Sequence, residues 1–440
     1  MRYSLLILAL IITSFGFSQE KEKDTTLVFK KRVLESTEVD FLASYYNQKG
    51  VHSSVSGGMG SEKLSDIASN IIVAMPLNDD DVLTVDVGLS AYTSASSSNI
   101  NPFDSKNPTP WQSSSGASEQ DALASLVLNY SHSSDDRNFL WNADVSFSNE
   151  YDYTSFGFGG GVTKLLNNKN SEISFKVNAY LDQWRPIYPK ELTDGNYSSY
   201  GGASYTPMFK KWDSTARNSY SASVGFSQVL TKKSQVSVFF DVLRQEGMLS
   251  TPYHRIYFAD KANYYFGDAN AIPNYESPNN LSVYRLADDI ERLPKTRFKL
   301  PIGLRWNYFI SEKVVVRTYY RYYSDDWDLK AHTASIELPI KLSDKFTLSP
   351  MYRYYTQTQS KYFAPFEKHV STEEFYTSDY DLSTFDANQY GFGLTYTDIF
   401  TSAKIWKFGI KNIDFRFNRY ERTDGLKANI ATIGFKFVMQ

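Results

Sequence analysis

A strict alternation of apolar and polar residues runs along most of this chain and constrains its fold more than any other feature. The clearest segment runs from Arg297 to Tyr308. Its apolar residues occupy every second position: Phe298, Leu300, Ile302, Leu304, Trp306 and Tyr308. Because successive side chains of a β-strand point to opposite faces, the segment predicts a strand with one apolar and one polar face. Its length matches the roughly 9–11 residues with which a tilted strand crosses a membrane.

About sixteen segments carry this pattern, which predicts an all-β protein. We expect strands near residues 38–46, 66–76, 82–93, 121–131, 138–150, 153–164, 171–183, 216–230, 234–245, 296–309, 313–324, 328–341, 345–358, 387–398, 409–421 and 426–439. Three prolines within them, Pro301, Pro339 and Pro350, each remove a hydrogen-bond donor, so we expect them to mark bulges or bends.

The connections between these segments alternate in length. Those after even-numbered strands are short, as at 77–81 and 133–136. Those after odd-numbered strands are often long: 47–65, 94–120, 184–215, 246–295 and 359–386. Short turns on one rim, long loops on the other and an even strand number are typical of outer-membrane barrels. The sequence therefore predicts a transmembrane antiparallel β-barrel of about 16 strands with short periplasmic turns, long extracellular loops and localisation in the outer membrane.

Two soluble β architectures compete with the barrel. A β-propeller requires a repeat of about 40–50 residues with a shared motif, and the sequence shows none. A β-sandwich buries its apolar face at modest size, whereas aromatic residues, 16% of this chain, recur along every strand. Aromatic rings suit pleated surfaces and membrane interfaces. The barrel with lipid as its outer partner is the favoured architecture.

The N-terminus has the pattern of an export signal. Residues 1–18 contain Arg2, an apolar run from Leu5 to Ile12 and a small-residue end before Gln19. We therefore expect a secretory signal peptide over 1–18, a periplasmic segment over 19–37 and the barrel over 38–440. The alternative is a short core helix at the N-terminus.

Charge and cysteine content exclude several classes of function. With 46 basic and 49 acidic residues, the formal net charge is −3, so no overall field recruits nucleic acid. The chain has no cysteine, which excludes disulfides, thiolate metal sites, iron–sulfur clusters and cysteine nucleophiles. We expect no cofactor bound by the chain itself, and no resident metal.

If the apolar face meets lipid, the polar face lines the barrel interior. Acidic inward positions come mainly from the first half of the chain: Asp40, Asp86, Asp144, Asp182 and Asp241. Basic inward positions come from three strands of the second half: Arg297, Lys299, Arg305, Arg317, Arg321 and Arg353. Opposed acidic and basic walls indicate a polar conduit that orients charged solutes. The alternative is that these residues pair across a filled lumen and hold a rigid scaffold.

Histidines of the long loops suggest chemistry at the extracellular rim. The rim candidates are His254, Asp325, Asp328 and His332. A carboxylate beside a histidine activates water in hydrolases, and the same residue types bind divalent cations. The alternative is that these residues have no chemical role, since polar surface loops commonly contain histidine and aspartate. We assign no catalytic residue and expect a protein that is not an enzyme, with a rim hydrolase as the second hypothesis.

Several segments resemble a known family. They are Tyr45–Tyr46, Val51–Ser53, Leu64–Ile67, Tyr92–Ser97, Ser250–Arg255, Tyr352–Gln357 and Phe375–Asp379 with Leu382–Ser383. In order and spread they resemble the Bacteroidota outer-membrane family known as domain of unknown function 3570, from about Glu35 to Gln440.

The resemblance implies an outer-membrane location and no established activity, so no site residue follows from it. It also implies a genomic setting beside a periplasmic flavin transferase, a thioredoxin-like protein and a small lipoprotein. From it we expect service to an extracytoplasmic flavin/redox or metal-handling system, with a small lipoprotein or a flavinylated periplasmic protein as partner. The function expected first is a conduit or a partner-binding scaffold.

Overall fold

The computed structural model describes residues 32–94, 120–193, 204–275, 277, 280 and 282–439. Val33–Gln440 forms one compact unit. The expected signal peptide over 1–18 and most of the loop over 94–120 lie outside the described residues. No helix of the described part is long and apolar enough to cross a membrane.

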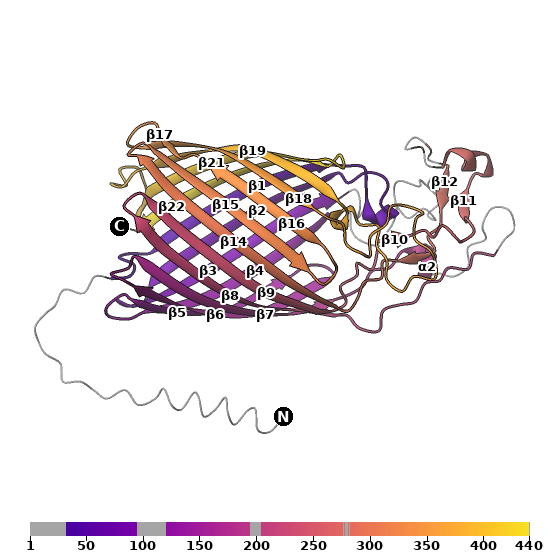
Figure 1. Cartoon of the computed structure of the whole chain (residues 1–440), viewed down its shortest axis with the longest axis horizontal. Coiled ribbons are helices and arrows are strands. Elements are labelled where there is room, and N and C mark those ends of the chain that lie inside the picture. The colour runs from indigo at the N-terminus through magenta and orange to yellow at the C-terminus, as the bar shows by residue number, and fades with distance from the viewer. Residues whose placement is uncertain are drawn as a thin grey trace, which may run out of the picture. The chain divides into compact units, whose positions relative to one another are not determined.

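Sixteen long antiparallel strands form one closed barrel (Figure 1). The first nine are β1 (Glu38–Lys49), β2 (Leu64–Pro76), β3 (Asp81–Ser94), β4 (Gln120–Ser133), β5 (Phe139–Asn149), β6 (Tyr153–Leu166), β7 (Ser171–Trp184), β8 (Ala216–Thr231) and β9 (Ser234–Gly247). The other seven are β14 (Thr296–Ser311), β15 (Val314–Asp325), β16 (Lys330–Glu337), β18 (Phe346–Gln357), β19 (Phe385–Thr397), β21 (Phe408–Arg422) and β22 (Lys427–Met439). The barrel closes because β22 pairs with β1, from Lys427 opposite Lys49 to Val438 opposite Glu38. The predicted fold class and strand number are confirmed.

The alternation read from the sequence is the two-sidedness of the barrel wall. Along β5, residues alternate between exposed and half-buried positions at every step, with Trp141, Val145 and Phe147 exposed. The exposed set on the other strands is equally apolar, and it includes Phe240, Ile302 and Phe392. A closed barrel satisfies its backbone hydrogen bonds internally, so an apolar outer surface is stable in lipid. The protein is therefore an outer-membrane β-barrel.

Two of the three prolines, Pro339 and Pro301, interrupt a ladder as expected, whereas Pro350 lies within β18 and pairs with Phe392 of β19 without a register shift. Pro339 separates β16 from the two-residue strand β17 (Ile340–Lys341), so the predicted strand over 328–341 is split. Pro301 lies in β14 where Leu300 and Pro301 have no partner in β9, between the pairs Lys299–Leu243 and Ile302–Phe240. At Pro339 and Pro301 the ladder loses pairing where the N–H donor is missing.

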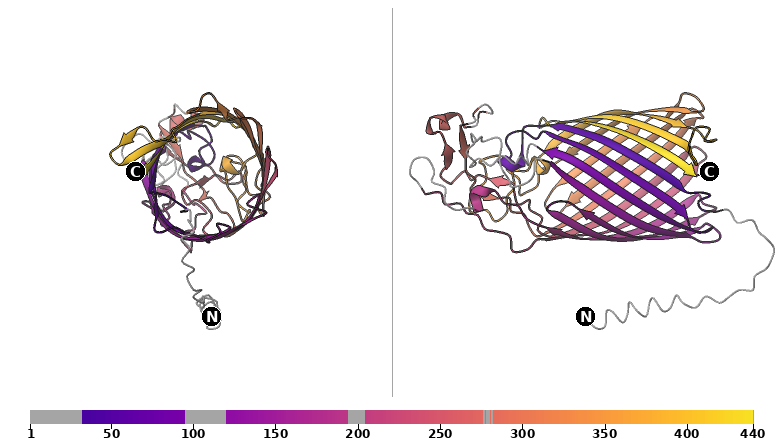
Figure 2. Two further views of the ribbon diagram at one scale, coloured as in Figure 1. Left: turned by 90° about the vertical axis from the view of Figure 1, so that its left-hand side faces the viewer. Right: turned by 180° about the vertical axis from the view of Figure 1, so that it is seen from behind.

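The two rims differ as the connection lengths predict. The rim that holds Met439 carries the short turns, together with a hairpin that contains β20 (Lys404–Ile405). In the view along the barrel this hairpin projects outside the circle of strands (Figure 2). The opposite rim carries the long connections, and their described segments cover 50–63, 185–193, 204–215, 248–275, 282–295 and 358–384.

The long connections pack into a folded body, which we call the cap. It contains η1 (Ser54–Ser56), α2 (Lys190–Thr193), β10 (Arg255–Ile256), β11 (Tyr265–Gly267), η3 (Ala269–Asn274), β12 (Val283–Arg285), β13 (Asp289–Ile290) and η4 (Tyr380–Leu382). The cap contains four hydrophobic residues that are each 0% exposed: Ile256, Val283, Ala287 and Ile290. It therefore has a buried apolar core of its own. Cap ribbons lie across the circle of strands in the view along the barrel (Figure 2).

Candidate functional site

The basic residues predicted to face the lumen lie on neighbouring strands, β14 to β18, and we call this side of the barrel the basic wall. Lys299 and Arg305 belong to β14, Arg317 and Arg321 to β15, and Arg353 to β18. All five occupy positions between the exposed apolar residues of their strands, such as Ile302, Tyr320 and Tyr352. Since neighbouring residues of a strand face opposite sides, these side chains point inward.

The acidic residues are spread around the rest of the wall. Asp86 lies on β3 and Asp144 on β5, far from β14–β18 in the strand order, whereas Asp182 lies on β7. Asp241 lies on β9, which pairs directly with β14, so it is beside the basic wall. Only part of the acidic set therefore opposes the basic wall.

Several of these charges have local partners. Asp86 accepts a hydrogen bond from Nδ2 of Asn70 at 3.0 Å, and Asp182 accepts one from the hydroxyl of Tyr153. The guanidinium of Arg305 lies over the rings of Phe239 and Tyr319, at 5.3 and 5.8 Å. These contacts hold the side chains against the wall and leave the centre of the lumen free of cross-lumen pairs from them.

One ion pair of the basic wall spans two intervening strands. Arg317 and Arg416 both lie 3.7 Å from Oε1 of Glu337. Arg416 lies on β21 and Glu337 on β16, so the contact passes over β18 and β19, where Gly393 of β19 lies beside Arg416. Neither Arg416 nor Glu337 was among the sequence candidates, although both lie at inward positions of their strands.

A cavity opens in the basic wall where small side chains separate large ones. On β16, Ala331 and Thr333 face inward between β15 and β18. Arg321 lies opposite Thr333, which lies opposite Tyr355, so a small side chain stands between two large ones. The result is a cavity of about 330 Å³.

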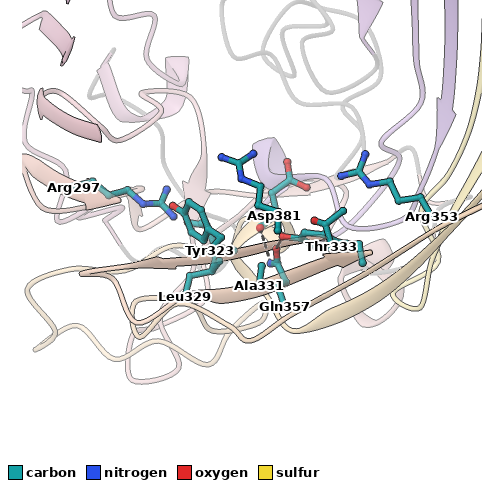
Figure 3. Close-up of a pocket in the computed structure, with 11 residues that line it drawn as sticks. Arg297, Tyr323, Leu329, Ala331, Thr333, Arg353, Gln357 and Asp381 are labelled. Atoms are coloured by element: carbon teal, nitrogen blue, oxygen red, sulfur yellow. Dashed lines mark hydrogen bonds between the residues drawn. The ribbon is translucent and has the colours of Figure 1, made fainter. Parts of the chain in front are cut away.

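Eleven residues line this cavity. They are Arg297, Arg321, Tyr323, Leu329, Ala331, Thr333, Arg353, Tyr355, Gln357, Asp381 and Leu382. Figure 3 shows Arg297 and Arg353 at opposite ends of the cavity, with Thr333 between them. We call this site the arginine pocket.

The cap supplies the roof of the arginine pocket through η4. Gln357, at the end of β18, donates from Nε2 to the carbonyl oxygens of Asp381 and Ser383, at 3.0 and 2.6 Å. Its own Oε1 accepts from the hydroxyl of Tyr355 at 2.5 Å. Asp381 is also paired with Nη1 of Arg422 at 2.5 Å. The pocket thus lies at the junction of the wall and the cap.

The predicted rim acids hold the turn between β15 and β16. Asp325 accepts from Nε and Nη2 of Arg297, at 2.9 and 2.5 Å, and from the backbone N–H groups of Trp327 and Leu329. Asp328 is exposed and lies 3.7 Å from Nζ of Lys361. The contacts of Asp325 anchor the turn to β14, and that of Asp328 connects it to the cap segment 358–384.

His332 is not brought together with these acids. It lies between Ala331 and Thr333, which line the lumen, so its ring points to the outer face. There its Nδ1 lies 2.7 Å from the hydroxyl of Tyr320, and its ring lies 5.2 Å from that of Tyr322. The expected pairing of His332 with Asp325 or Asp328 does not form, because the β-strand puts the ring on the other face of the wall.

His254 has acidic neighbours that the sequence did not identify. Ligand atoms of His254, Glu291 and Asp379 lie within 4.8 Å of one another, inside the cap. Nδ1 of His254 lies 3.4 Å from Oε2 of Glu291, which also accepts from the hydroxyl of Thr377 at 2.6 Å. One imidazole and two carboxylates are suitable ligands for a divalent cation, and the same set suits proton transfer.

Burial shifts the pKa values in this cluster. Burial raises the pKa of Asp379 to about 7, and the nearby carboxylates Asp381 and Glu291 contribute in the same direction. For His254, burial alone favours the neutral ring, but Glu291 outweighs it and raises the pKa. Sequence reasoning missed Glu291 and Asp379 because they are separated from His254 by long loop segments with no regular period.

Two other loop histidines have local packing contacts. The ring of His52 stacks on Tyr380 with 3.7 Å between centroids. His369 is buried, with Nδ1 at 2.5 Å from Oε2 of Glu373 and Nε2 at 2.9 Å from the carbonyl oxygen of Thr377. The His52 contact joins the connection after β1 to that after β18, and the His369 contacts hold the second of these connections in its own fold.

Comparison with known proteins identifies a family. A family model described as "Protein of unknown function (DUF3570)" matches residues 4–434. No curated protein matches the chain at a significant level.

Solved structures resemble the chain only distantly. A structure titled "Bacterial polysaccharide outer membrane secretin" has a TM-score of 0.44 and 9% identity, with 93% of this chain and 100% of that chain covered. A Pseudomonas aeruginosa FadL homologue has a TM-score of 0.40 and 10% identity, with 92% and 91% covered. OccK2 (OpdF) of Pseudomonas aeruginosa, in complex with glucuronate, has a TM-score of 0.38 and 8% identity, with 93% and 99% covered.

Proposed function

From the premise that this chain belongs to the family described as a protein of unknown function (DUF3570), we propose that it is a conduit for polar solutes across the outer membrane. The observation that carries the proposal is the polar inner face of a closed barrel with sixteen long strands. Barrels of about this size are wide enough for an aqueous passage. The cap at one mouth then controls entry.

The basic wall gives the conduit a preference for anions. Arg305, Arg317 and Arg321 present guanidinium groups on two adjacent strands, and a low-dielectric wall strengthens their field in the lumen. The acids farthest from this wall, Asp86 and Asp144, orient the field across the lumen. A solute with a negative group therefore passes along the β14–β18 side.

The test is ion conductance of the purified barrel in planar bilayers. We expect discrete conductance steps and a reversal potential that indicates anion preference in a salt gradient. Arg305→Glu and Arg317→Glu should each shift the preference toward cations. Arg244→Glu is the matched control, because Arg244 is 61% exposed on the outer face of β9 and should leave selectivity unchanged.

The outcome that contradicts the conduit is silence at all voltages, including in a variant whose cap is loosened. Gln357→Leu provides that variant, since Gln357 ties η4 to β18. A barrel that stays closed with the cap loosened has no passage to regulate, and a scaffold role would replace the conduit.

The proposal includes a link to an extracytoplasmic flavin/redox or metal-handling system. Its support is the genomic setting that the family resemblance implies, with a small lipoprotein or a flavinylated periplasmic protein as partner. Purification from native membranes tests it directly. A stoichiometric flavin-carrying companion is expected, and its absence from repeated preparations would separate the barrel from that system.

A rim hydrolase is the second candidate, and one observation favours it. His254, Glu291 and Asp379 place an imidazole beside two carboxylates, which suits activation of water. His254→Ala should then abolish any hydrolysis of peptide or ester substrates by the barrel, whereas His332→Ala, on the outer face, should not. Equal rates in both variants and the wild type would remove this candidate.

A further inference from the structure

Two arginines of the arginine pocket lack acidic partners. The side chains of Arg321 and Arg353 make no ion pair and no hydrogen bond with any residue in the described part of the chain. Their neighbours on the wall differ: Arg317 is paired with Glu337, and Arg305 lies over two aromatic rings. Arg321 is half-buried, and Arg353 is exposed toward the lumen. A guanidinium without a partner gains most from a carboxylate or phosphate that it can bind with two parallel hydrogen bonds.

The other charged residues of the pocket have partners of opposite charge. Arg297 is paired with Asp325, and its guanidinium lies 4.2 Å from the ring centre of Trp327. Asp381 is paired with Arg422, which also binds Asp424 at 2.5 Å. That cluster of one cation and two carboxylates has a net negative charge, whereas Arg321 and Arg353 are the two cations of the lining without an acidic partner.

Polar groups between the two arginines are suited to an oxyanion. Thr333 is 7% exposed, and its hydroxyl has no hydrogen-bond partner among the described residues, so it is available as a donor. The Tyr355 hydroxyl donates to Gln357, and that of Tyr323 donates to Asp325 at 2.8 Å. Tyr323 and Tyr355 thus present ring surface and leave the donor role to the arginines and Thr333.

We propose that the arginine pocket binds a small dianion, a phosphate ester or a dicarboxylate, between Arg321 and Arg353. The cavity of about 330 Å³ is at the small end of ligand sites, so the ligand has the size of a metabolite. Two charges are required because a monoanion leaves one guanidinium unpaired. A neutral solute gains neither charge-assisted contact.

The roof relates the site to passage. Asp381 and Leu382 of η4 close the cavity on the cap side, and Gln357 fixes η4 to the wall. A bound dianion therefore lies where the cap meets the lumen, at the entry to the passage. The inference rests on the proposed conduit for its role as a solute site, but binding itself does not require conduction.

Isothermal titration calorimetry of the full-length barrel in detergent at low salt tests the site. The probes are succinate and inorganic phosphate, with acetate as a monoanion and succinamide as a neutral match for succinate. We expect saturable binding of both dianions, at least about tenfold weaker binding of acetate, and none of succinamide. Arg321→Gln and Arg353→Gln should each weaken dianion binding about tenfold.

Two further variants keep the test decisive. Thr333→Leu fills the cavity without changing charge and should also weaken binding. Arg244→Gln removes an arginine of the outer face, outside the lining and the lumen, and should leave binding unchanged. Heat-modifiable migration on gels verifies that each variant holds a folded barrel.

Conductance of the same samples separates the two proposals. Loss of binding in the Arg321 and Arg353 variants supports the dianion site whether or not the barrel conducts. Absence of succinate and phosphate binding, or binding that both glutamine variants and Thr333→Leu leave unchanged, overturns the site even if the barrel conducts. Equal binding of succinate and succinamide also overturns it.

Discussion

Arg255 and Glu191, each 0% exposed, form a two-pronged ion pair inside the cap, with Nε–Oε1 at 2.5 Å and Nη2–Oε2 at 3.1 Å. Nη1 of Arg255 donates to the carbonyl oxygen of Val55 at 3.0 Å. Three connections, after β1, β7 and β9, therefore meet at one guanidinium. Burial disfavours this cation, but Glu191 outweighs burial and raises the pKa of Arg255 above its usual value.

Glu191→Gln should loosen the cap and spare the barrel. Removing one partner of a buried pair leaves an uncompensated charge, at a cost of about 3–5 kcal/mol. That cost falls on the cap, whose packing with the wall is separate from the ladders of the sixteen strands. Limited proteolysis should cut the variant within 185–215 or 248–295, while heat-modifiable migration stays normal. Proteolysis at the wild-type rate would show that the pair does not hold the connections together.

Rising pH should loosen the cap around Asp379. The pKa of Asp379 rises from about 4 in the unfolded chain to about 7 in the fold, so the folded cap favours the protonated carboxyl. The stability that this group contributes to the cap is therefore lost as pH rises between these two values. His254 has a raised pKa, so its contribution is present below its unfolded pKa of about 6.5 and is lost as pH rises through the folded value. Both groups act in one direction, with Glu291 and Asp381 as the carboxylates that face them.

Hydrogen exchange of residues 358–384 over a pH series measures this effect, after correction for the intrinsic exchange rate. Protection should fall as pH passes from acidic to about 7. Asp379→Asn should keep most of its protection across the series, because the amide does not ionise. An unchanged pH profile in that variant would assign the effect to other groups.

Gln357→Leu should release the roof of the arginine pocket. The change removes the donors to the carbonyl oxygens of Asp381 and Ser383, and leaving buried polar groups unpaired costs about 1–3 kcal/mol each. We expect larger or more frequent open states in single-channel recordings. Gln389→Leu is the control. Gln389 lies on β19, opposite Arg353 of β18, and is farther from η4 along the strand than Gln357 is. Identical recordings from the two variants would mean that η4 does not limit passage.

The hairpin between β19 and β21 should enter the lipid interface. Ile399, Phe400 and Trp406 are 80%, 86% and 96% exposed, and Lys404 and Lys407 lie beside them. Aromatic residues with adjacent lysines are favoured at the level of lipid headgroups. In vesicles, brominated lipids should quench Trp406, measured as the difference between wild type and Trp406→Phe. Quenching by aqueous iodide instead would place the hairpin in water, open to a protein partner.

Sequence reasoning succeeded where the period of two applies. The strands over Arg297–Tyr308 and the other fifteen segments follow from alternation, because each residue of a strand must face either lipid or lumen. The same rule placed Arg321 and Arg353 on the inner face. The same rule predicts that His332 faces outward, because its neighbour Thr333 faces inward. The rim hypothesis instead grouped His332 with Asp325 because the two are near in sequence.

The sequence by itself determined the barrel, its two rims and which side chains line it, since alternation and connection length are local properties. Only the tertiary structure decided how loops without a period pack, and hence that His254 meets Asp379 and Arg255 meets Glu191. It also decided that Arg321 and Arg353 share one cavity, because the strand pairing places the small residues of β16 between them. Contacts between distant segments depend on strand register and loop packing, and the residues of a single strand determine neither.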